Sequence, residues 1–395
     1  MGIPHLQHWD EQCVKINGQQ KKVLRHRLFG NGEGGRCLAR GKTYAVDIMV
    51  TLVAIAKRGT VAMAQQGPIR RCPQSEISKC MEQFIDRITS AVRKGCSKVP
   101  SKSKNHLHPL VAHNVKLILV FDGKRLVCMC LMSDKNIREI LMLINLTTSC
   151  MCRYPYKKDT HVQRQQSREV DFSAAKTPSE VQQMARKSNT YNGEIIYCVQ
   201  KWLQQRPKLR KNILLFGAPF EAEAQCVHLE KQCIVDAILS SDSDMVCHGA
   251  RVLYSGYNTK PIRNKSSTKP TGPYVYCQRK HKLFKDLQPN EMAALTAFLG
   301  SDYVPGIPKH GYKKAFPLFQ AWRRAAKAGE EEEKACMRKL ERLSPGFTTQ
   351  LQESIHHFIH YPVYQLQFAS SASTDYVKKR RAFWSGGSEG PVLLT

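Results

Sequence analysis

Paired acidic residues follow apolar runs at two points of the chain. Glu221 and Glu223 come directly after the run NILLFGAPF, and Asp242 and Asp244 come after VDAILSS. Carboxylates this close repel one another unless protons or cations neutralise them. Divalent cations do this well, and oxygen ligands without His or Cys suit Mg²⁺, for which Mn²⁺ can substitute. The spacing therefore predicts carboxylates that bind metal ions.

The elements that must position these acids are short strands. Apolar runs rich in β-forming residues predict strands at 43–48, 116–121, 212–216, 235–240 and 251–255. Between them, segments such as 75–92 and 179–203 have the three- and four-residue spacing of helices. Strands that alternate with helices predict an α/β fold, with a mostly parallel twisted sheet and helices on both faces.

Two further acids fall at predicted strand ends. Asp47 lies in the first strand run and Asp122 directly follows the second. Because the carboxyl ends of parallel strands line one crevice, we expect these acids and the two pairs to gather there. Asp242 and Asp244 should point to the same side while the chain is extended, whereas Glu221 and Glu223 should open a helix. A single Asp at a strand end is usually a cap or turn residue. The prediction of a metal site therefore depends on the fact that acids follow several apolar runs.

The charge balance indicates a polyanionic partner. Lys and Arg number 61 and Asp and Glu 32, so the net charge is +29. Like charge in this amount destabilises a compact chain unless a polyanion neutralises it, and nucleic acid is the expected one. A basic surface that serves solubility alone stays open. Metal and polyanion together indicate phosphodiester hydrolysis, in which two ions about 4 Å apart activate water and stabilise the leaving oxygen.

Other classes of protein are not favoured. GNGEGG (30–35) has the spacing of a dinucleotide-binding loop, but it precedes the first predicted strand instead of following it. The C-x-C pairs at 128–130 and 150–152 lack a His at zinc-finger spacing. The longest apolar stretch, 45–56, is too short to cross a bilayer, so we expect no membrane partner. With no visible secretory leader, the 15 Cys are expected to be reduced thiols.

Several motifs together resemble the flap-endonuclease/XPG superfamily of 5′ nucleases. They are MGI at the start, AVDI (45–48), LVFDG (119–123), APFEAEAQ (218–225), SSDSDMV (240–246) and GSDYVPGI (300–307). Their order and rough spacing match that family from residue 1 to about 382. RGTVAMAQQGP (58–68) and FIHYPVYQLQFASS (358–371) are most similar to exonuclease 1, whereas GIPKHG (306–311) is similar to the XPG branch.

The resemblance implies site residues. The metal-holding carboxylates would be Asp47, Asp122, Glu221, Glu223, Asp242, Asp244 and, beyond the acids placed by spacing, Asp302. A helix-hairpin-helix at about 290–325 would grip the duplex backbone, with K⁺ bound to its carbonyls. The DNA contacts implied there and at the amino end are Gly2, Gly306, Lys309, Gly311, Lys313 and Lys314. The two later glycines would allow close approach and the lysines would supply charge.

Two departures from the family pattern concern catalysis. The family carries a Lys and an Arg in an arch over the scissile phosphate, and Met129 and Asn136 stand at those positions here. Val53 stands where the family stacks an aromatic ring on a base, and such stacking is worth on the order of 1–3 kcal/mol. We expect slow cutting or a different arch. Nearby basic residues that could substitute, the last two as catalytic groups, are Lys124, Arg125, Lys135 and Arg138.

The resemblance also implies a domain plan. It comprises an N-terminal nuclease region (1–125), an arch or linker (126–178), an internal nuclease region (179–285), a helix-hairpin-helix region (286–383) and a flexible tail (384–395).

The implied function is Mg²⁺-dependent hydrolysis of DNA at 5′ ends, flaps, or nicked or gapped duplex, by 5′→3′ exonuclease or flap-endonuclease action in repair, replication or recombination. Two alternatives stay open. One is a DNA-binding scaffold whose catalysis has decayed, and the other is a 5′→3′ exoribonuclease, since some of those also begin with MGIPHL. KKRR (378–381) is either a nuclear import signal or a basic face. We expect a nuclear protein, with the mitochondrion as the alternative.

Overall fold

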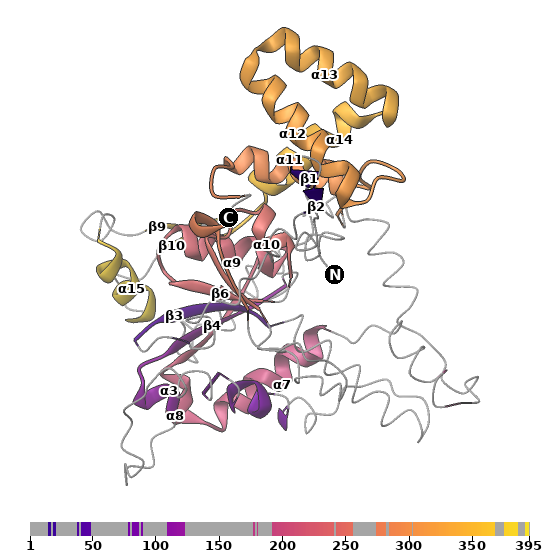
Figure 1. The fold of residues 1–395 in the computed structure, drawn as a ribbon. Coiled ribbons are helices and arrows are strands. Elements are labelled where there is room, and N and C mark those ends of the chain that lie inside the picture. The colour runs from indigo at the N-terminus through magenta and orange to yellow at the C-terminus, as the bar shows by residue number, and fades with distance from the viewer. Residues whose placement is uncertain are drawn as a thin grey trace. The chain divides into compact units, whose positions relative to one another are not determined.

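Figure 1 shows a computed structural model of the chain. It describes residues 15–16, 19–20, 38, 41–48, 78–79, 81–86, 88–89, 109–122, 177, 180, 192–240, 242–255, 274–281, 284–301, 303–367, 375–385 and 392–394. None of the helices in these ranges is long and apolar enough to cross a bilayer. The chain forms two compact units. Unit 1 comprises Met1–Gly35, Asp242–Ser255 and Tyr274–Pro362, and unit 2 comprises Arg36–Ser241, Gly256–Pro273 and Val363–Thr395.

Unit 2 is built on a parallel sheet. Its strands, in the spatial order β5-β4-β3-β6, are all parallel to their neighbours. Val46 at the centre pairs with Leu119 on one side and Leu239 on the other. Nearly every residue of these strands is buried, as expected of parallel strands covered on both faces. The predicted α/β class and mostly parallel sheet are confirmed. The strand bounds are β3 Thr43–Asp47, β4 Lys116–Phe121, β5 Ile213–Gly217 and β6 Ala237–Leu239.

Helices of unit 2 follow the predicted alternation. α9 packs against β3, β4 and β6, and most of its residues are buried. Residues 78–79, 81–86 and 88–89 are helical within the predicted helix 75–92. One or two helices were expected over 179–203, and the structure describes α7 there from residue 192 on. The helix bounds are α3 Pro109–Ala112, α7 Asn192–Gln204, α8 Pro207–Arg210, α9 Ala222–Lys231 and α15 Tyr376–Ser385.

Unit 1 is mainly helical. α11 packs against α12 and α14, and α12 and α13 form a long helical hairpin (Figure 1). Its core holds aromatic rings around Phe298, whose centroid is 4.9 Å from that of Phe347 and 5.5 Å from that of Phe319. The helices are α10 Asp244–Cys247, the 3₁₀ helix η6 Gln278–Lys280, α11 Pro289–Leu299, α12 Tyr312–Ala328, α13 Glu330–Leu343 and α14 Phe347–Ile359.

The remaining strands pair antiparallel. In unit 1 these are β7 Val252–Ser255 with β8 Tyr274–Cys277, and β1 Lys15–Ile16 with β2 Gln19–Gln20. In unit 2, β9 Gln365–Gln367 pairs with β10 Val392–Leu394.

The C-terminal segment includes a short strand. The tail predicted to be flexible, 384–395, includes β10, because Val and Leu favour strands and β9 offers a backbone partner. The segment from Val363 on belongs to unit 2, although the helices before it belong to unit 1. Tyr364 holds it there, since its N–H donates to Gln225 Oε1 of α9 at 2.8 Å. The compact units are therefore discontinuous in the chain, unlike the five consecutive regions of the predicted plan.

Candidate active site

Four acids of unit 2 lie where its parallel strands end. Asp47 is the last residue of β3 and is 1% exposed, and Asp122 directly follows β4. Glu221 is the N-cap of α9 and Glu223 lies in its first turn, so these two open a helix as expected. The pairing of Asp47 with Val120, and of Phe121 with Gly217, brings the three strand ends to one edge of the sheet.

Hydrogen bonds orient two of these carboxylates. The Ala222 N–H donates to Asp122 Oδ1 at 3.0 Å, so Asp122 caps the amino end of α9, where a negative charge is favourable. The Ser240 hydroxyl, just beyond β6, donates to Asp47 Oδ2 at 3.1 Å. A buried hydrogen bond to a charged group holds that group in one orientation. Ser240 is a positioning residue that sequence reasoning missed.

The Cys226 thiol lies within the electrostatic field of this acidic edge. Cys226 is fully buried on α9, three residues after Glu223. Burial raises the pKa of its thiol well above the ordinary value, and the charges of Asp47, Glu223 and Asp122 raise it further, followed by that of Glu230. Three of the predicted metal ligands are thus close to one buried atom. The i, i+3 spacing of Glu223 and Cys226 on one helix face could be seen in the sequence. No local pattern, however, distinguished Cys226 from the other Cys of the chain.

The acids of unit 1 form a local turn. Asp242 and Asp244 are each 5% exposed, and the Asp244 N–H donates to Asp242 Oδ1 at 3.1 Å. The expectation that both point to one side of an extended chain is wrong, because Ser243 between them has helical backbone angles (φ −82°, ψ −17°) and α10 begins at Asp244. A short polar side chain that bonds the backbone two residues on favours such a turn.

The donor chemistry suits a hard divalent cation, but the geometry of a complete site is not seen. Asp47, Asp122 and Glu223 offer only oxygen, and the protonated Cys226 thiol is no competing ligand. Within the ranges that the structure describes, no group of three or more His, Cys, Asp or Glu side chains is close enough to hold a metal ion. Asp302 lies outside those ranges. The seven-carboxylate metal site therefore stays a prediction.

The predicted DNA-gripping turn lies between α11 and α12 of unit 1. Lys309, Gly311, Lys313 and Lys314 are exposed. Gly306 is buried instead, with φ +77°, and a Cβ there would lie 2.5 Å from the Gly300 nitrogen. Its glycine is therefore needed to close the turn on itself, not to let DNA approach as expected. At Gly311 a Cβ would meet nothing within 4 Å, so the space for close approach is present there.

Comparison with known proteins places these motifs in a family. The model of the XPG I-region matches residues 212–302, which include both acid pairs. The chain is 30% identical to the DNA excision repair protein ERCC-5 homolog of Xenopus laevis over 41% of its length and 12% of that protein. It is 33% identical to flap endonuclease 1 of Enterocytozoon bieneusi (28% and 30% covered), and 28% to exodeoxyribonuclease 1 of Saccharomyces cerevisiae (42% and 23%).

Over these segments the chain is similar to the flap-endonuclease/XPG superfamily of 5′ nucleases. The matched segments cover between 12% and 30% of these three relatives' lengths. The exonuclease 1 branch, favoured by the sequence, is among the relatives at an identity comparable to those of the other branches. A solved structure of the catalytic core of Rad2 with a DNA substrate aligns at a TM-score of 0.42 and 18% identity, over 82% of this chain and 81% of that one. A score this low decides nothing, so the fold assignment rests on the strand pairing above.

The superfamily's other expected positions lie outside the described residues. They are the basic residues that could substitute in the arch, the two arch positions and the base-stacking position that depart from the family, and the amino end. In that order these are Lys124, Arg125, Lys135, Arg138, Met129, Asn136, Val53 and Gly2. Their roles stay predictions.

Proposed function

We propose that this protein is a member of the flap-endonuclease/XPG superfamily and a Mg²⁺-dependent, structure-specific 5′ nuclease acting on DNA. The observation that supports it best is the set of strand-end carboxylates around Cys226, in a chain of net charge +29. Acids this scarce and this concentrated at the ligand-binding edge of a parallel sheet are suited to hold cations beside a phosphodiester. The relatives named above are DNA nucleases and an excision repair protein, which supports DNA as the substrate.

The residues that would hold Mg²⁺, or Mn²⁺ in its place, are Asp47, Asp122, Glu221, Glu223, Asp242, Asp244 and Asp302. When bound, a pair of such ions supplies an activated water and stabilises the leaving oxygen. The chain's own task is to orient these acids. Ser240 does so for Asp47, and the Ala222 N–H does so for Asp122.

DNA would be held by the turn between α11 and α12. Lys309 and Lys314 are exposed there and are suited to contact phosphates, with K⁺ bound to turn carbonyls as a further proposal. We extend the proposal to 5′ ends, flaps, and nicked or gapped duplex, and to a nuclear role in DNA repair, replication or recombination.

The test is cleavage of 5′-labelled duplex, nicked, gapped and flapped DNA with Mg²⁺. We expect 5′-phosphate products, whose lengths separate stepwise exonuclease action from flap release. Asp242→Ala should abolish cutting while DNA binding is retained. No cleavage by the wild type in either Mg²⁺ or Mn²⁺ contradicts the proposal, and faster cutting of matched RNA would assign it to 5′→3′ exoribonucleases.

A DNA-binding scaffold is the second candidate. Met129 and Asn136, which stand where the superfamily carries its basic arch residues, favour it. A scaffold would bind the flapped substrate with equal affinity in the wild type and in Asp242→Ala, and neither protein would cut it.

A further inference from the structure

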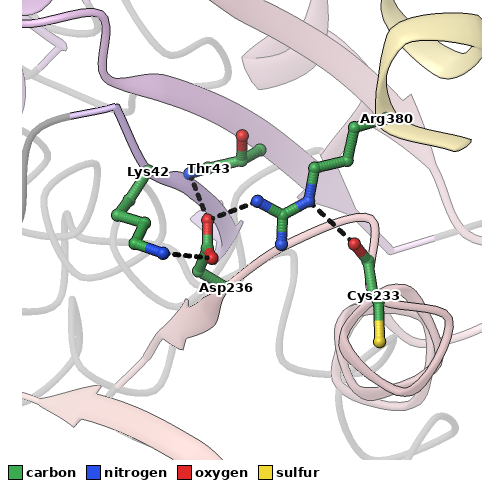
Figure 2. Close-up of polar contacts among 5 residues, drawn as sticks. All are labelled: Lys42, Thr43, Cys233, Asp236 and Arg380. Carbon is green, nitrogen blue, oxygen red and sulfur yellow. Dashed lines mark hydrogen bonds and ion pairs between the residues drawn. The ribbon is translucent and has the colours of Figure 1, made fainter. Parts of the chain in front are cut away.

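The Asp236 carboxylate lies at one end of the sheet. The opposite end is the acidic edge, which carries Asp47, Asp122, Glu221 and Glu223. Asp236 precedes β6, and its Oδ2 accepts a 2.9 Å hydrogen bond from the Thr43 N–H at the start of β3 (Figure 2). The Asp236 N–H donates back to the Thr43 carbonyl at 2.7 Å. The Lys42 ammonium lies 3.0 Å from Oδ1. Asp236 thus joins β3 and β6 where their pairing begins.

The C-terminal helix is attached to the same carboxylate. Arg380 of α15 donates through Nη1 to Asp236 Oδ2 at 2.8 Å, and through Nε to the Cys233 carbonyl at 2.8 Å (Figure 2). The guanidinium therefore spans the turn that leads from α9 into β6. A fork of donors on one planar group fixes direction as well as distance, which a single ammonium does not.

Apolar contacts hold α15 on the sheet. Phe383 is 1% exposed and packs on Phe216 of β5, with ring centroids 6.2 Å apart. The Lys116 ammonium of β4 lies 4.6 Å from the centre of the Trp384 ring. Together with Arg380, these contacts tie α15 to β4, β5 and the entry of β6. Phe383 is therefore part of the core of unit 2, and α15 packs on the sheet through it.

The charge of Asp236 is maintained in this setting. Burial acts to raise the pKa of its carboxyl, but hydrogen bonds from Thr43, Arg380 and Lys42 outweigh burial, and the pKa lies below the ordinary value. The carboxylate is therefore ionised at neutral pH, where it bonds all three donors at once.

The two strands that Asp236 joins lead directly to the candidate active site. The pairs Tyr44 with Ala237 and Val46 with Leu239 set their register, and beyond the last pair Ser240 bonds Asp47. A slip of one residue would turn each side chain to the other face, and Ser240 would lose Asp47. The register in which β3 and β6 begin to pair therefore determines whether Ser240 can orient the Asp47 carboxylate at the other end of these strands.

We propose that Asp236, anchored by Arg380 of α15, is a positioning residue for the acidic edge. The C-terminal helix thereby acts on catalysis without touching DNA or metal, and its catalytic readout rests on the proposed nuclease function. KKRR (378–381) acquires a structural role: its Arg380 is held by Asp236, so a receptor that takes an extended basic peptide must first unwind α15.

The test compares Arg380→Gln with Arg380→Lys and with Lys378→Ala. Arg380→Gln keeps a polar side chain but removes the charge and the guanidinium donors that reach Asp236. Arg380→Lys keeps the charge, and Lys378 is an exposed control on the same helix. We expect Arg380→Gln to lower kcat about tenfold with KM for flapped DNA unchanged, because positioning is lost and DNA contacts are kept. Arg380→Lys should recover part of kcat, and Lys378→Ala should match the wild type.

Amide hydrogen exchange provides a readout that does not depend on activity. In Arg380→Gln, exchange should accelerate in α15 and also at Thr43–Asp47 and Ala237–Leu239, and in Lys378→Ala it should not. Unchanged exchange in these two strands, or a kcat equal to that of the wild type, overturns the proposal. If the wild type cuts no DNA, the proposed function fails, and the exchange comparison still decides whether Arg380 supports the strands. Asp236→Asn is the second variant and should accelerate exchange in the same two strands.

Discussion

The acids at the strand ends of unit 2 and the lysines of the α11–α12 turn in unit 1 are held in opposite ways. Asp47 is 1% exposed and accepts a hydrogen bond from Ser240. Lys309 and Lys314 are exposed on a turn and on the first turn of a helix. Buried charges are costly unless neighbouring groups compensate them, whereas exposed charges cost little. The acids are thus built for one arrangement, and the lysines for contact with a polyanion that arrives from solvent.

The backbones differ in the same sense. The acids follow β3, β4 and β5, whose parallel pairing leaves little freedom at the strand ends. The lysines follow a turn closed by Gly300 and Gly306, both with positive φ. We therefore expect changes among the acids to affect the chemical step, and changes among the lysines to affect binding.

The largest effect is expected at Asp47. Asp47→Asn keeps the shape of the side chain but removes a charge from the acidic edge, so kcat should fall roughly 10²–10³-fold. The Kd for flapped DNA, measured by fluorescence anisotropy, should stay within about twofold. Asp86→Asn, at an exposed acid of unit 2, is the control and should cut normally. If the Asp47→Asn variant cut normally, the strand-end acids could no longer be said to act on the chemical step while the lysines act on binding.

The turn offers a matched pair of glycines. Gly306→Ala places a methyl group against the Gly300 backbone at positive φ, so the free energy of unfolding should fall by on the order of 3 kcal/mol. Gly311→Ala meets no atom within 4 Å but replaces the N-cap glycine of α12, so it should lower the free energy of unfolding by only about 1 kcal/mol. Urea denaturation measures both. Equal losses would show that the turn is not closed by the Gly300–Gly306 approach.

A half-buried imidazole on α9 should make unit 2 sensitive to acid. Burial lowers the pKa of His228 to about 4, with a smaller contribution from Lys231. The unfolded chain, with an imidazole pKa of about 6.5, binds more protons between these values, so stability falls as pH drops from about 6.5 to about 4. His228→Gln should reduce this loss by roughly 2–3 kcal/mol.

Urea denaturation at pH 7 and pH 4.5 measures the difference. His356→Gln, at an exposed imidazole of α14, serves as the control and should leave the loss unchanged. An identical loss in His228→Gln and the wild type would refute the lowered pKa of the half-buried His228 imidazole.

The smallest effect is expected for the lysines. Each phosphate contact removed should reduce the slope of log affinity against log salt by about 0.9. The double variant Lys309→Ala/Lys314→Ala should therefore lower that slope by about 2 and weaken DNA binding, with kcat at saturating DNA unchanged. Lys201→Ala, at an exposed lysine on α7, is the comparison. A fall in kcat at saturation would mean that the lysines take part in more than binding.

Much of the fold was predictable because its signals are local. Apolar runs with β-forming residues predicted the strands around Val46, Leu119, Leu215 and Leu239 within one or two residues of their bounds. Glu221 and Glu223 were predicted to open a helix, since they follow the Gly and Pro that end β5. The turn between Asp242 and Asp244 was not foreseen, because a side chain that bonds the backbone two residues on competes with an extended chain.

By itself, the sequence determined the strands, the order in which the acids follow them, and the surplus of positive charge, because each depends on neighbouring residues or on composition. Only the tertiary structure decided that Cys226 lies amid three of the acids, and that Gly306 makes room for Gly300. It alone joined Arg380 to Asp236, 144 positions away. Such contacts follow from the packing of whole elements against one another, for which no local residue pattern carries a signal.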